Sequence, residues 1–333
     1  MSLDYKILGG PGRDNALWVR VDSGQSVSRL LFDCGAGCLT TLGLAEILAV
    51  EQIFFSHLHM DHVGGFDSLF RCLYNRNSVA NEIWGPPQTS EILQHRFQGF
   101  WWNLIDDQDA TWRVCDVHPD RIERCHFELS EAFSARHHDE VVSGDGPLID
   151  TPHYYVESIQ LRHHGTTLGY RVCEKPRQNI NIEATAALGL HPGPWMQTLK
   201  DASHVGPLEI DGNTYNIDEL RTKVMTETAG ESIAYLTDFL LDEPTLQTLV
   251  PWLSGCQTIV CEAQYRREDI ALAEKYHHAT TEQVSRLAAE ANVETLLLFH
   301  LSDRYERPEW SEMLAQCRAN FTRTYFPSHW NLS

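Results

Sequence analysis

The sequence predicts a layered α/β protein in which short buried strands alternate with helices. Five apolar segments are bounded by Gly, Asp or His, a pattern that suits strands buried on both faces. These segments are residues 29–33, 52–56, 232–237, 258–261 and 295–299. Segments with helical spacing lie between them, and this alternation is typical of layered α/β folds.

Two helices are predicted from apolar residues that recur on one helical face. The first follows the strand at 52–56, and its stripe consists of Phe66, Leu69, Phe70 and Leu73. The second begins near 280–283, where Thr-Thr-Glu-Gln resembles a capping box. Its stripe consists of Val284, Leu287, Ala288 and Ala291. Both stripes indicate helices that belong to the layers of this fold.

Two stretches interrupt the alternation. Residues from about 100 to 150 hold three tryptophans, an acidic run and a Ser-Gly-Asp-Gly-Pro loop. Residues from about 174 to 231 hold a short helical pattern, a His-Pro-Gly-Pro segment and a turn at 211–213. Because no Pro/Gly-rich linker separates independent domains, we expect one domain over 1–333. It carries insertions at about 100–150 and an arm-like segment at about 174–231, and surface elaboration is the simplest explanation of both.

Composition and charge narrow the class of protein. The 333 residues are 42% hydrophobic, and no apolar run is long enough to span a bilayer. The first residues lack the features of a signal peptide, so a cytoplasmic protein with no membrane partner is expected. The nine cysteines show no repeating spacing, which predicts reduced, packed thiols. The formal charge of −20 argues against non-specific affinity for polyanions.

Residues 57–65 read His-Leu-His-Met-Asp-His-Val-Gly-Gly and directly follow a predicted strand. Alternation along an extended segment places His57 and His59 on the same side, so both imidazoles can reach one metal ion. Asp61 and His62 fall in the turn that follows, where they can face a second ion. Such a density of metal-binding side chains at a strand end is rare in an ordinary polar loop. The segment therefore predicts a metal centre.

The pattern H-x-H-x-D-H-x-G-G resembles the signature of the metallo-β-lactamase superfamily, whose fold is an αββα sandwich of two similar halves. Further segments resemble the ribonuclease Z branch of that superfamily. They are residues 31–35 (Leu-Phe-Asp-Cys-Gly), 163–171, 187–194, 235–238, 261–263, 278–280 and 299–305. The resemblance covers most of the chain except the segment around 100–150, and it implies the αββα fold.

The resemblance also implies two zinc ions per chain. The implied ligands are His57, His59 and His163 for one ion, Asp61, His62 and His300 for the other, and Asp238 as a bridge between them. His164 is the alternative to His163. The positions of Gly169 and Tyr170, six and seven residues after His163, favour His163. Zinc suits His and Asp ligands, and manganese or iron would fit the same set.

Four residues are candidates for catalysis or for support of the ligands, and one of them, Asp61, is also an implied ligand. His278 precedes His300 by 22 positions, the spacing of the acid in the family that the chain resembles. It is therefore the candidate that protonates the leaving group, and Glu262, at the end of a predicted strand, is the candidate that orients it. Asp61 would orient the attacking water as well as bind metal. Asp33 would accept a hydrogen bond from a ligand imidazole.

The resemblance implies a phosphodiesterase that cuts the 3′ trailer from precursor tRNA, usually as a homodimer. The sequence departs from the family in its opening motif, where Ala36-Gly37-Cys38-Leu39 replaces Gly-Glu-Gly-Thr-Gln after Gly35. Residues 174–200, which would belong to a basic tRNA-gripping arm, hold only three basic residues. Hydrolysis of a small phosphodiester or another ester is therefore a second hypothesis. A non-catalytic homologue that acts as a binding module is a third, which the complete ligand set disfavours.

Overall fold

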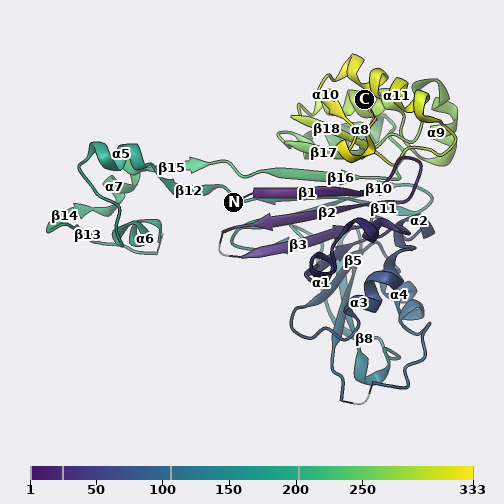
Figure 1. The fold of residues 1–333 in the computed structure, drawn as a ribbon, viewed down its shortest axis with the longest axis horizontal. Helices are drawn as coiled ribbons and strands as arrows, with labels where there is room; N and C mark the ends of the chain where they lie inside the picture. The colour runs from purple at the N-terminus through teal and green to yellow at the C-terminus, as the bar shows by residue number, and fades with distance from the viewer. Residues whose placement is uncertain (1, 25, 106, 202, 333) are drawn as a thin grey trace. The chain divides into compact units, whose positions relative to one another are not determined.

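Two β-sheets pack together in the larger part of the chain (Figure 1). The structure is a computed structural model that describes residues 2–24, 26–105, 107–201 and 203–332. The chain divides into unit 1, which comprises Met1–Cys173 and Glu231–Ser333, and unit 2, which comprises Glu174–Gly230. All the predicted metal ligands belong to unit 1.

Within the described residues, the first sheet of unit 1 has eight strands that follow sequence order. Its outer strands pair antiparallel, whereas β3 to β6 pair parallel. The strands are β1 (Ser2–Gly9), β2 (Asn15–Asp22), β3 (Val27–Phe32), β4 (Gln52–Phe54), β5 (Asn81–Gly85), β6 (Thr111–Val117), β7 (Arg121–Glu128) and β8 (His137–Ser143). Much of the segment around 100–150 thus forms strands of this sheet.

The second sheet has, over the same described ranges, seven strands in the order β19-β18-β17-β16-β11-β10-β9. They are β9 (Ile149–Asp150), β10 (Tyr154–Arg162), β11 (Thr166–Glu174), β16 (Ser232–Leu236), β17 (Thr258–Glu262), β18 (Thr295–Phe299) and β19 (Thr324–Tyr325). Strands β16 to β19 pair parallel, with Leu236 opposite Cys261 and Glu262 opposite Phe299. Their carboxyl ends therefore meet at one edge of the sheet, where ligand sites of α/β proteins form.

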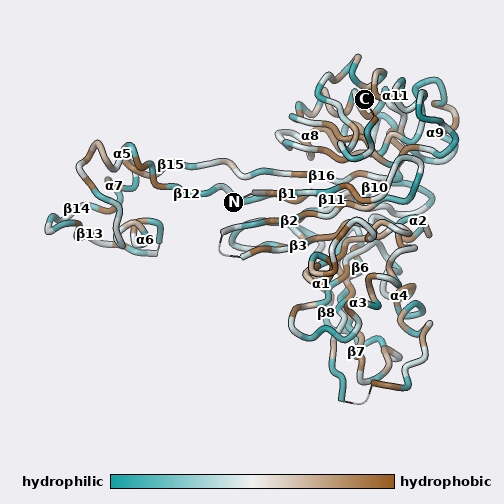
Figure 2. The backbone as a smooth tube through the Cα atoms, viewed as in Figure 1, coloured by the Kyte–Doolittle hydropathy of each residue, from teal (hydrophilic) through white to brown (hydrophobic). Residues whose placement is uncertain are grey.

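Helices cover the outer faces of the two sheets. Apolar residues of α1 (Leu44–Leu48), α3 (Phe66–Leu73) and α4 (Thr89–Phe97) form a cluster with the first sheet. Apolar residues of α8 (Glu243–Leu253), α10 (Thr281–Glu290) and α11 (Arg307–Asn320) join the larger core cluster, which also fills the space between the sheets. Unit 1 also contains the short α-helices α2 (Met60–Val63) and α9 (Ile270–Tyr276). Hydrophobic stretches lie along α1, α3 and neighbouring strands (Figure 2).

Unit 2 has an apolar core of its own, which includes Leu190, Trp195, Leu199 and Leu220. Its elements are β12 (Arg177–Ile180), α5 (Ile182–Ala187), α6 (Trp195–Lys200), β13 (Pro207–Ile210), β14 (Asn213–Asn216), α7 (Ile217–Val224) and β15 (Met225–Thr228). Strands β12 and β15 pair antiparallel. The predicted turn at 211–213 joins β13 to β14, and Asp211 and Gly212 adopt the positive φ that such a tight turn requires.

The predicted layered α/β class is confirmed, and all five predicted strands form. Thr280 also caps α10 in the predicted capping box with Gln283. All nine cysteines lie in the described residues, where none forms a disulfide and eight are buried. Among the described helices, none combines the length and the apolar character that a membrane span needs.

Candidate metal centre

The histidine-rich segment lies between β4 and α3, where the chain turns sharply. Close backbone approaches enforce the turn. A Cβ at Gly65 would lie 2.3 Å from the carbonyl oxygen of Gly35, and a Cβ at Gly35 would lie 2.5 Å from that of Asp61. Only glycine permits these two approaches. The carbonyl of Ser56 accepts a hydrogen bond from the Leu168 amide of β11, which ties the segment to the second sheet.

The structure brings all seven predicted ligands together around Asp238. The ligand atoms of His57, His59, His163 and Asp238 lie within 4.8 Å of one another, and so do those of Asp61, His62, His300 and Asp238. One carboxylate oxygen of Asp238 faces Nε2 of His57 at 3.6 Å, and the other faces Nε2 of His62 at 3.3 Å. Asp238 therefore stands between two groups of donors, as a bridging carboxylate would.

Three strand ends present their side chains to the site through an unusual backbone conformation. Asp33 follows β3 with a φ of 58°, Asp238 follows β16 with a φ of 51°, and His300 follows β18 with a φ of 50°. Non-glycine residues seldom adopt this left-handed region, which turns the chain abruptly and is enriched at functional sites. The turn directs each polar side chain into the space beside the strand ends.

Three buried imidazoles are each held through Nδ1. Nδ1 of His62 donates to Asp33 at 2.7 Å, and Nδ1 of His163 donates to the His277 carbonyl at 2.9 Å. Nδ1 of His57 lies 3.1 Å from the Ser56 hydroxyl, which itself donates to Asp33, so Nδ1 of His57 is the donor. In each ring Nε2 then carries the lone pair that a metal needs.

Orphaned nitrogens test whether this donor set fits metal ions. Among the described side chains, Nε2 of His57, Nε2 of His62 and Nδ1 of His300 are buried without a hydrogen-bond partner. All three nitrogens lie 3.3 to 3.6 Å from the carboxylate of Asp238. Buried polar atoms are normally satisfied, so these unpaired nitrogens need an explanation. Divalent cations explain them, because imidazole and carboxylate are ordinary ligands of zinc and related metals. The residues therefore fit a metal centre.

Asp33 forms a buried anchor beneath the site. Its carboxylate accepts hydrogen bonds from the Ser56 amide, the Ser56 hydroxyl, Nδ1 of His62 and the Tyr235 hydroxyl, at 2.7 to 2.9 Å. Four donors compensate the burial of one charge. Asp33 thus fixes His62 directly and His57 through Ser56. The sequence pointed to Asp33, whereas Ser56 and Tyr235 emerge only from the structure.

His278 and Glu262 form a pair beside the ligands. Nδ1 of His278 donates to Oε2 of the fully buried Glu262 at 2.8 Å, and Oε1 of Glu262 accepts the Phe239 amide at 3.0 Å. Burial alone would lower the pKa of His278, but the charge and hydrogen bond of Glu262 outweigh it and raise that pKa. Glu262 therefore favours the imidazolium form of His278, which is the form that a general acid requires.

Burial and charge act differently on the ligand histidines. Burial, with the neighbouring His62, lowers the pKa of His57 to about 2, so this ring stays neutral and ready to bind metal. Burial also acts on His62, but the carboxylates of Asp238 and Asp33 outweigh it and raise the pKa of His62. Cations would compete with protons for these nitrogens, because a metal binds only the unprotonated imidazole.

The geometry separates His163 from its neighbour His164. His163 is buried and lies in the ligand group with His57 and His59. A third group of possible metal-binding atoms comprises Asp238, Glu262, His278 and His300, and within the described residues His164 belongs to none of the three groups. His164 is exposed and stacks on His277 at 5.0 Å between ring centroids. The ring of His277 also contacts the His163 carbonyl. His163 is thus the one of the two whose side chain lies among the predicted ligands.

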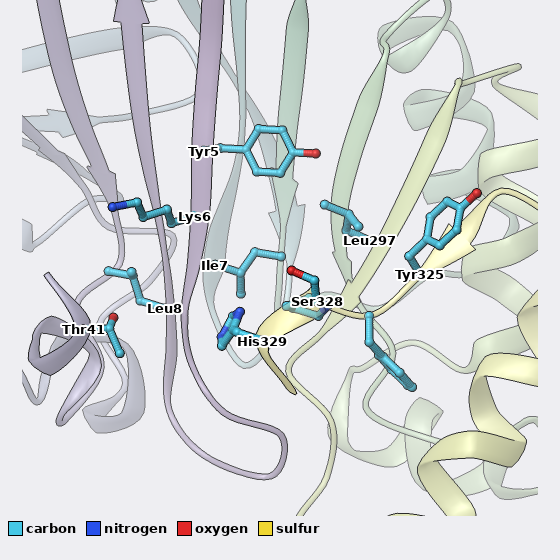
Figure 3. A pocket seen from close by; sticks show the side chains of 11 residues that line it. Tyr5, Lys6, Ile7, Leu8, Thr41, Leu297, Tyr325, Ser328 and His329 are labelled. Carbon is cyan, nitrogen blue, oxygen red and sulfur yellow. The ribbon is translucent and has the colours of Figure 1, made fainter. Parts of the chain in front are cut away.

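Two cavities of unit 1 differ in their relation to the ligands. A cavity of about 360 Å³ opens beside His57, His59 and His163, and residues 86–88 form part of its wall. A larger cavity of about 650 Å³ lies between β1 and the C-terminal segment, where Lys6, Ile7, Tyr325 and His329 line it (Figure 3). The predicted ligands border the first cavity alone, so it is the candidate substrate site.

Solved structures with the same architecture include a metallo-β-lactamase fold protein, YhfI from Bacillus subtilis. It is 14% identical, covers 98% of this chain and 96% of its own, and has a TM-score of 0.58. The short form of human tRNase Z is 15% identical, covers 90% of this chain and 93% of its own, and has a TM-score of 0.52. The chain therefore has the predicted metallo-β-lactamase fold.

Sequence comparison identifies the family. The chain is 45% identical to a ribonuclease Z from Deinococcus radiodurans over 328 residues, which cover 98% of each protein. It belongs to the ribonuclease Z family. A family model described as anti-Pycsar protein Apyc1 also matches residues 14–143, which is less than half of the chain.

Proposed function

We propose that this protein is a two-zinc phosphodiesterase that removes the 3′ trailer from precursor tRNA. The observation that carries the proposal is the identity of 45% with a ribonuclease Z over 98% of both chains, combined with a complete set of candidate ligands. Chance retention of seven metal-binding side chains in one cluster would be unexpected in a non-catalytic homologue. The same cluster therefore argues against a pure binding module.

The proposed sites contain His57, His59 and His163 on one side and Asp61, His62 and His300 on the other, with Asp238 between them. Imidazole and carboxylate ligands favour zinc, and manganese or iron would suit the same donors. Two such ions would activate a water molecule and neutralise the charge of a phosphodiester. Asp61 is half-buried and reaches both His62 and His300, so it is suited to orient that water as well as bind metal.

His278 supplies the proton in this proposal. Attack of water forms a new P–O bond and breaks the bond to the leaving oxygen, which departs as an alkoxide unless it is protonated. The hydrogen bond from Nδ1 to Glu262 leaves Nε2 of His278 to deliver the proton. Glu262 keeps the ring oriented and favours its charged form.

The proposal also includes a homodimer and a cytoplasmic location. Met60, Trp101 and Leu104 are large apolar side chains of unit 1 that are 86%, 86% and 79% exposed. Contiguous exposed apolar surface often marks a protein contact, and Trp101 and Leu104 lie three positions apart in the chain, which supports self-association. Sedimentation equilibrium of the wild-type chain would measure the number of protomers.

Hydrolysis of a small phosphodiester is the second candidate, and charge favours it. Residues 174–230 hold five basic and eight acidic residues. The basic residues are Lys175, Arg177, Lys200, Arg221 and Lys223, and the acidic residues are Glu174, Glu183, Asp201, Glu209, Asp211, Asp218, Glu219 and Glu227. A surface that grips RNA through phosphates is normally basic. Unit 2 is therefore an unusual tRNA-binding arm.

A substrate panel tests the proposal. The zinc-loaded protein is expected to hydrolyse bis(p-nitrophenyl) phosphate and to cut precursor tRNA at one position, and a chelator should abolish both activities. Cyclic nucleotides serve as the competing small substrates. Cleavage of small esters without binding or cleavage of precursor tRNA at low salt would favour the second candidate. No hydrolysis of any substrate by the metal-loaded protein would favour the binding module.

A further inference from the structure

We propose that Asn15 is a positioning residue that sets the imidazole of His300 for the second metal ion. The inference rests on the two-metal site proposed above. It assigns a role to a residue that lies outside the ligand set and outside every motif that the sequence analysis singled out.

His300 lacks the side-chain anchor that the other buried ligand histidines possess. The rings of His57, His62 and His163 are each held through Nδ1 by a group that does not bind metal. Within the described residues, Nδ1 of His300 is buried without a hydrogen-bond partner. Carboxylate oxygens of Asp61, Asp238 and Glu262 lie 3.4 to 3.8 Å from its ring nitrogens. The backbone must therefore set the direction of this ring.

Asn15 holds that backbone. Its side-chain oxygen accepts a hydrogen bond from the His300 amide at 3.2 Å, and the residue is 2% exposed. The amide nitrogen of Asn15 donates to the carbonyl oxygens of Leu8 and Gly10, at 3.2 and 3.1 Å. Because two carbonyls occupy the amide nitrogen, the oxygen must face His300. The contact holds a residue whose φ of 50° departs from the extended strand before it.

The turn that carries Asn15 contacts two segments that supply ligands of the proposed second site. One segment packs against Asp61, and the other follows His300. The carboxylate of Asp14 accepts the Ala36 amide at 2.8 Å, next to Gly35, which packs against the Asp61 carbonyl. A Cβ at Gly12 would lie 3.3 Å from Asp303 Cα, just beyond His300. The C-terminal segment also approaches the end of β1 beside Leu8 and His329 (Figure 3). Asn15 thus lies where the two halves of the second site meet.

Asn81 offers a matched control in the same unit. It is 3% exposed and makes three hydrogen bonds, because it donates to the carbonyls of Arg76 and Thr111 and accepts from the Arg76 guanidinium. It lies outside the ligand groups. Truncation of either asparagine to alanine removes a buried side-chain amide that makes three hydrogen bonds. Only truncation of Asn15 releases His300.

The test measures zinc binding to the full chain in metal-buffered solutions, by competition with a chromophoric chelator. Asn15→Ala is expected to keep one tight ion and to bind the second about 10- to 100-fold more weakly, the usual effect of losing a residue that orients a ligand. Asn81→Ala is expected to bind both ions as the wild type does. Asn15→Asp keeps the acceptor for the His300 amide, so it should weaken the second ion less than Asn15→Ala. Turnover of Asn15→Ala should recover as free zinc is raised.

The outcomes separate this inference from the proposed function. A wild-type chain that binds fewer than two ions would overturn both. If the wild type binds two ions and Asn15→Ala binds them equally well, the role of Asn15 is refuted and the two-metal site stands. Equal losses in Asn15→Ala and Asn81→Ala would show a general effect of core destabilisation and would also refute the role. If Asn15→Ala fails to fold, Asn15→Leu takes its place, because it has a similar shape and lacks the acceptor for the His300 amide. Weaker binding of the second ion by Asn15→Leu than by Asn15→Asp supports the role, and equal binding by the two variants refutes it.

Discussion

In the proposed mechanism, individual side chains of this site divide between metal binding and proton transfer. His57, His62 and His163 each use one ring nitrogen for a structural hydrogen bond and keep the other for the centre of the site. His278 also uses Nδ1 for a structural hydrogen bond, but its acceptor is the carboxylate of Glu262. A charged acceptor favours the imidazolium, whereas the carbonyl that holds His163 lets burial keep that ring neutral. Nδ1 of His62 also donates to a carboxylate, that of Asp33, and the pKa of His62 is raised as well. The partner of Nδ1 therefore distinguishes the candidate acid from His57 and His163, but not from His62.

Removal of the acid should separate turnover from metal content. His278→Ala is expected to retain two zinc ions and to lose about 10²- to 10⁴-fold in turnover of a substrate with a poor leaving group. Metal analysis and single-turnover hydrolysis measure the two effects. The surface variant His95→Ala provides the control, because His95 is exposed on α4 and lies outside the ligand groups. Zinc loss in His278→Ala would contradict the assignment of His278 as an acid.

Helix and strand ends position the functional side chains. Asp238 and His300 project from the ends of β16 and β18, while His278 lies two residues before Thr280, the N-cap of α10. The capping box between Thr280 and Gln283 fixes this start, and the Tyr265 carbonyl accepts the Thr281 amide. The elements that place these groups are short, with strands of five residues. These short strands hold the side chains at their ends in place because four of the five residues in each strand are buried.

The start of α8 provides a stability test at the scale of one element. Asp242 caps this helix by accepting the Thr245 amide at 3.1 Å, and it also pairs with Arg162 at 2.6 Å. Asp242→Ala is expected to lower the free energy of unfolding by about 1 kcal/mol at pH 7. Partial burial would raise the pKa of Asp242, but the hydrogen bonds from Thr245 and the charge of Arg162 lower it overall. The stabilisation is therefore present above the pKa of the unfolded carboxyl and is lost as the pH falls through the lower pKa of the folded state.

Urea denaturation of the wild type and Asp242→Ala at several pH values measures this difference. The gap between the two proteins should narrow as the solution becomes more acidic than the ordinary aspartate pKa. Asp242→Asn keeps the cap without the charge, so it should be nearly as stable as the wild type at neutral pH. Equal stability of Asp242→Ala and the wild type at pH 7 would show that the cap contributes nothing.

At the scale of the molecule, chemistry and the arm-like segment are carried by different units. Every candidate ligand and the acid lie in unit 1, whereas unit 2 has its own core. The net charge of −20 and the acidic balance of unit 2 make strong electrostatic attraction to RNA unexpected. Recognition of a precursor tRNA would then depend on contacts other than general attraction between a basic arm and phosphates.

Excision of unit 2 tests this separation. Strands β11 and β16 pair antiparallel up to Cys173 and Ser232, so an Asn-Gly turn in place of residues 175–230 would close them as a hairpin. The shortened chain is expected to keep two zinc ions and to hydrolyse bis(p-nitrophenyl) phosphate like the full chain. Precursor tRNA cleavage by the same variant then measures what unit 2 contributes to recognition. Loss of metal from the shortened chain would disprove the separation.

Much of the fold and the candidate ligand set followed from local patterns. The five strands, the helix at Phe66–Leu73 and the capped start of α10 were predictable because burial and capping leave marks within a few residues. His57, His59, Asp61 and His62 were predictable for the same reason, since they share one short segment. His163, Asp238 and His300 lie far apart in sequence, and only the resemblance to a known family joined them before the structure did.

Tertiary structure alone decided how these groups are held. The contact between Asn15 and His300 joins residues 285 positions apart, and the contact between Tyr235 and Asp33 joins residues 202 apart. No periodicity or spacing marks such pairs, because they form only when two sheets pack face to face. The choice of the metal-facing nitrogen in His57 likewise depends on the Ser56 hydroxyl being committed to Asp33. The sequence by itself determined which chemistry this protein carries, and packing of the two halves decided the orientation of the groups that perform it.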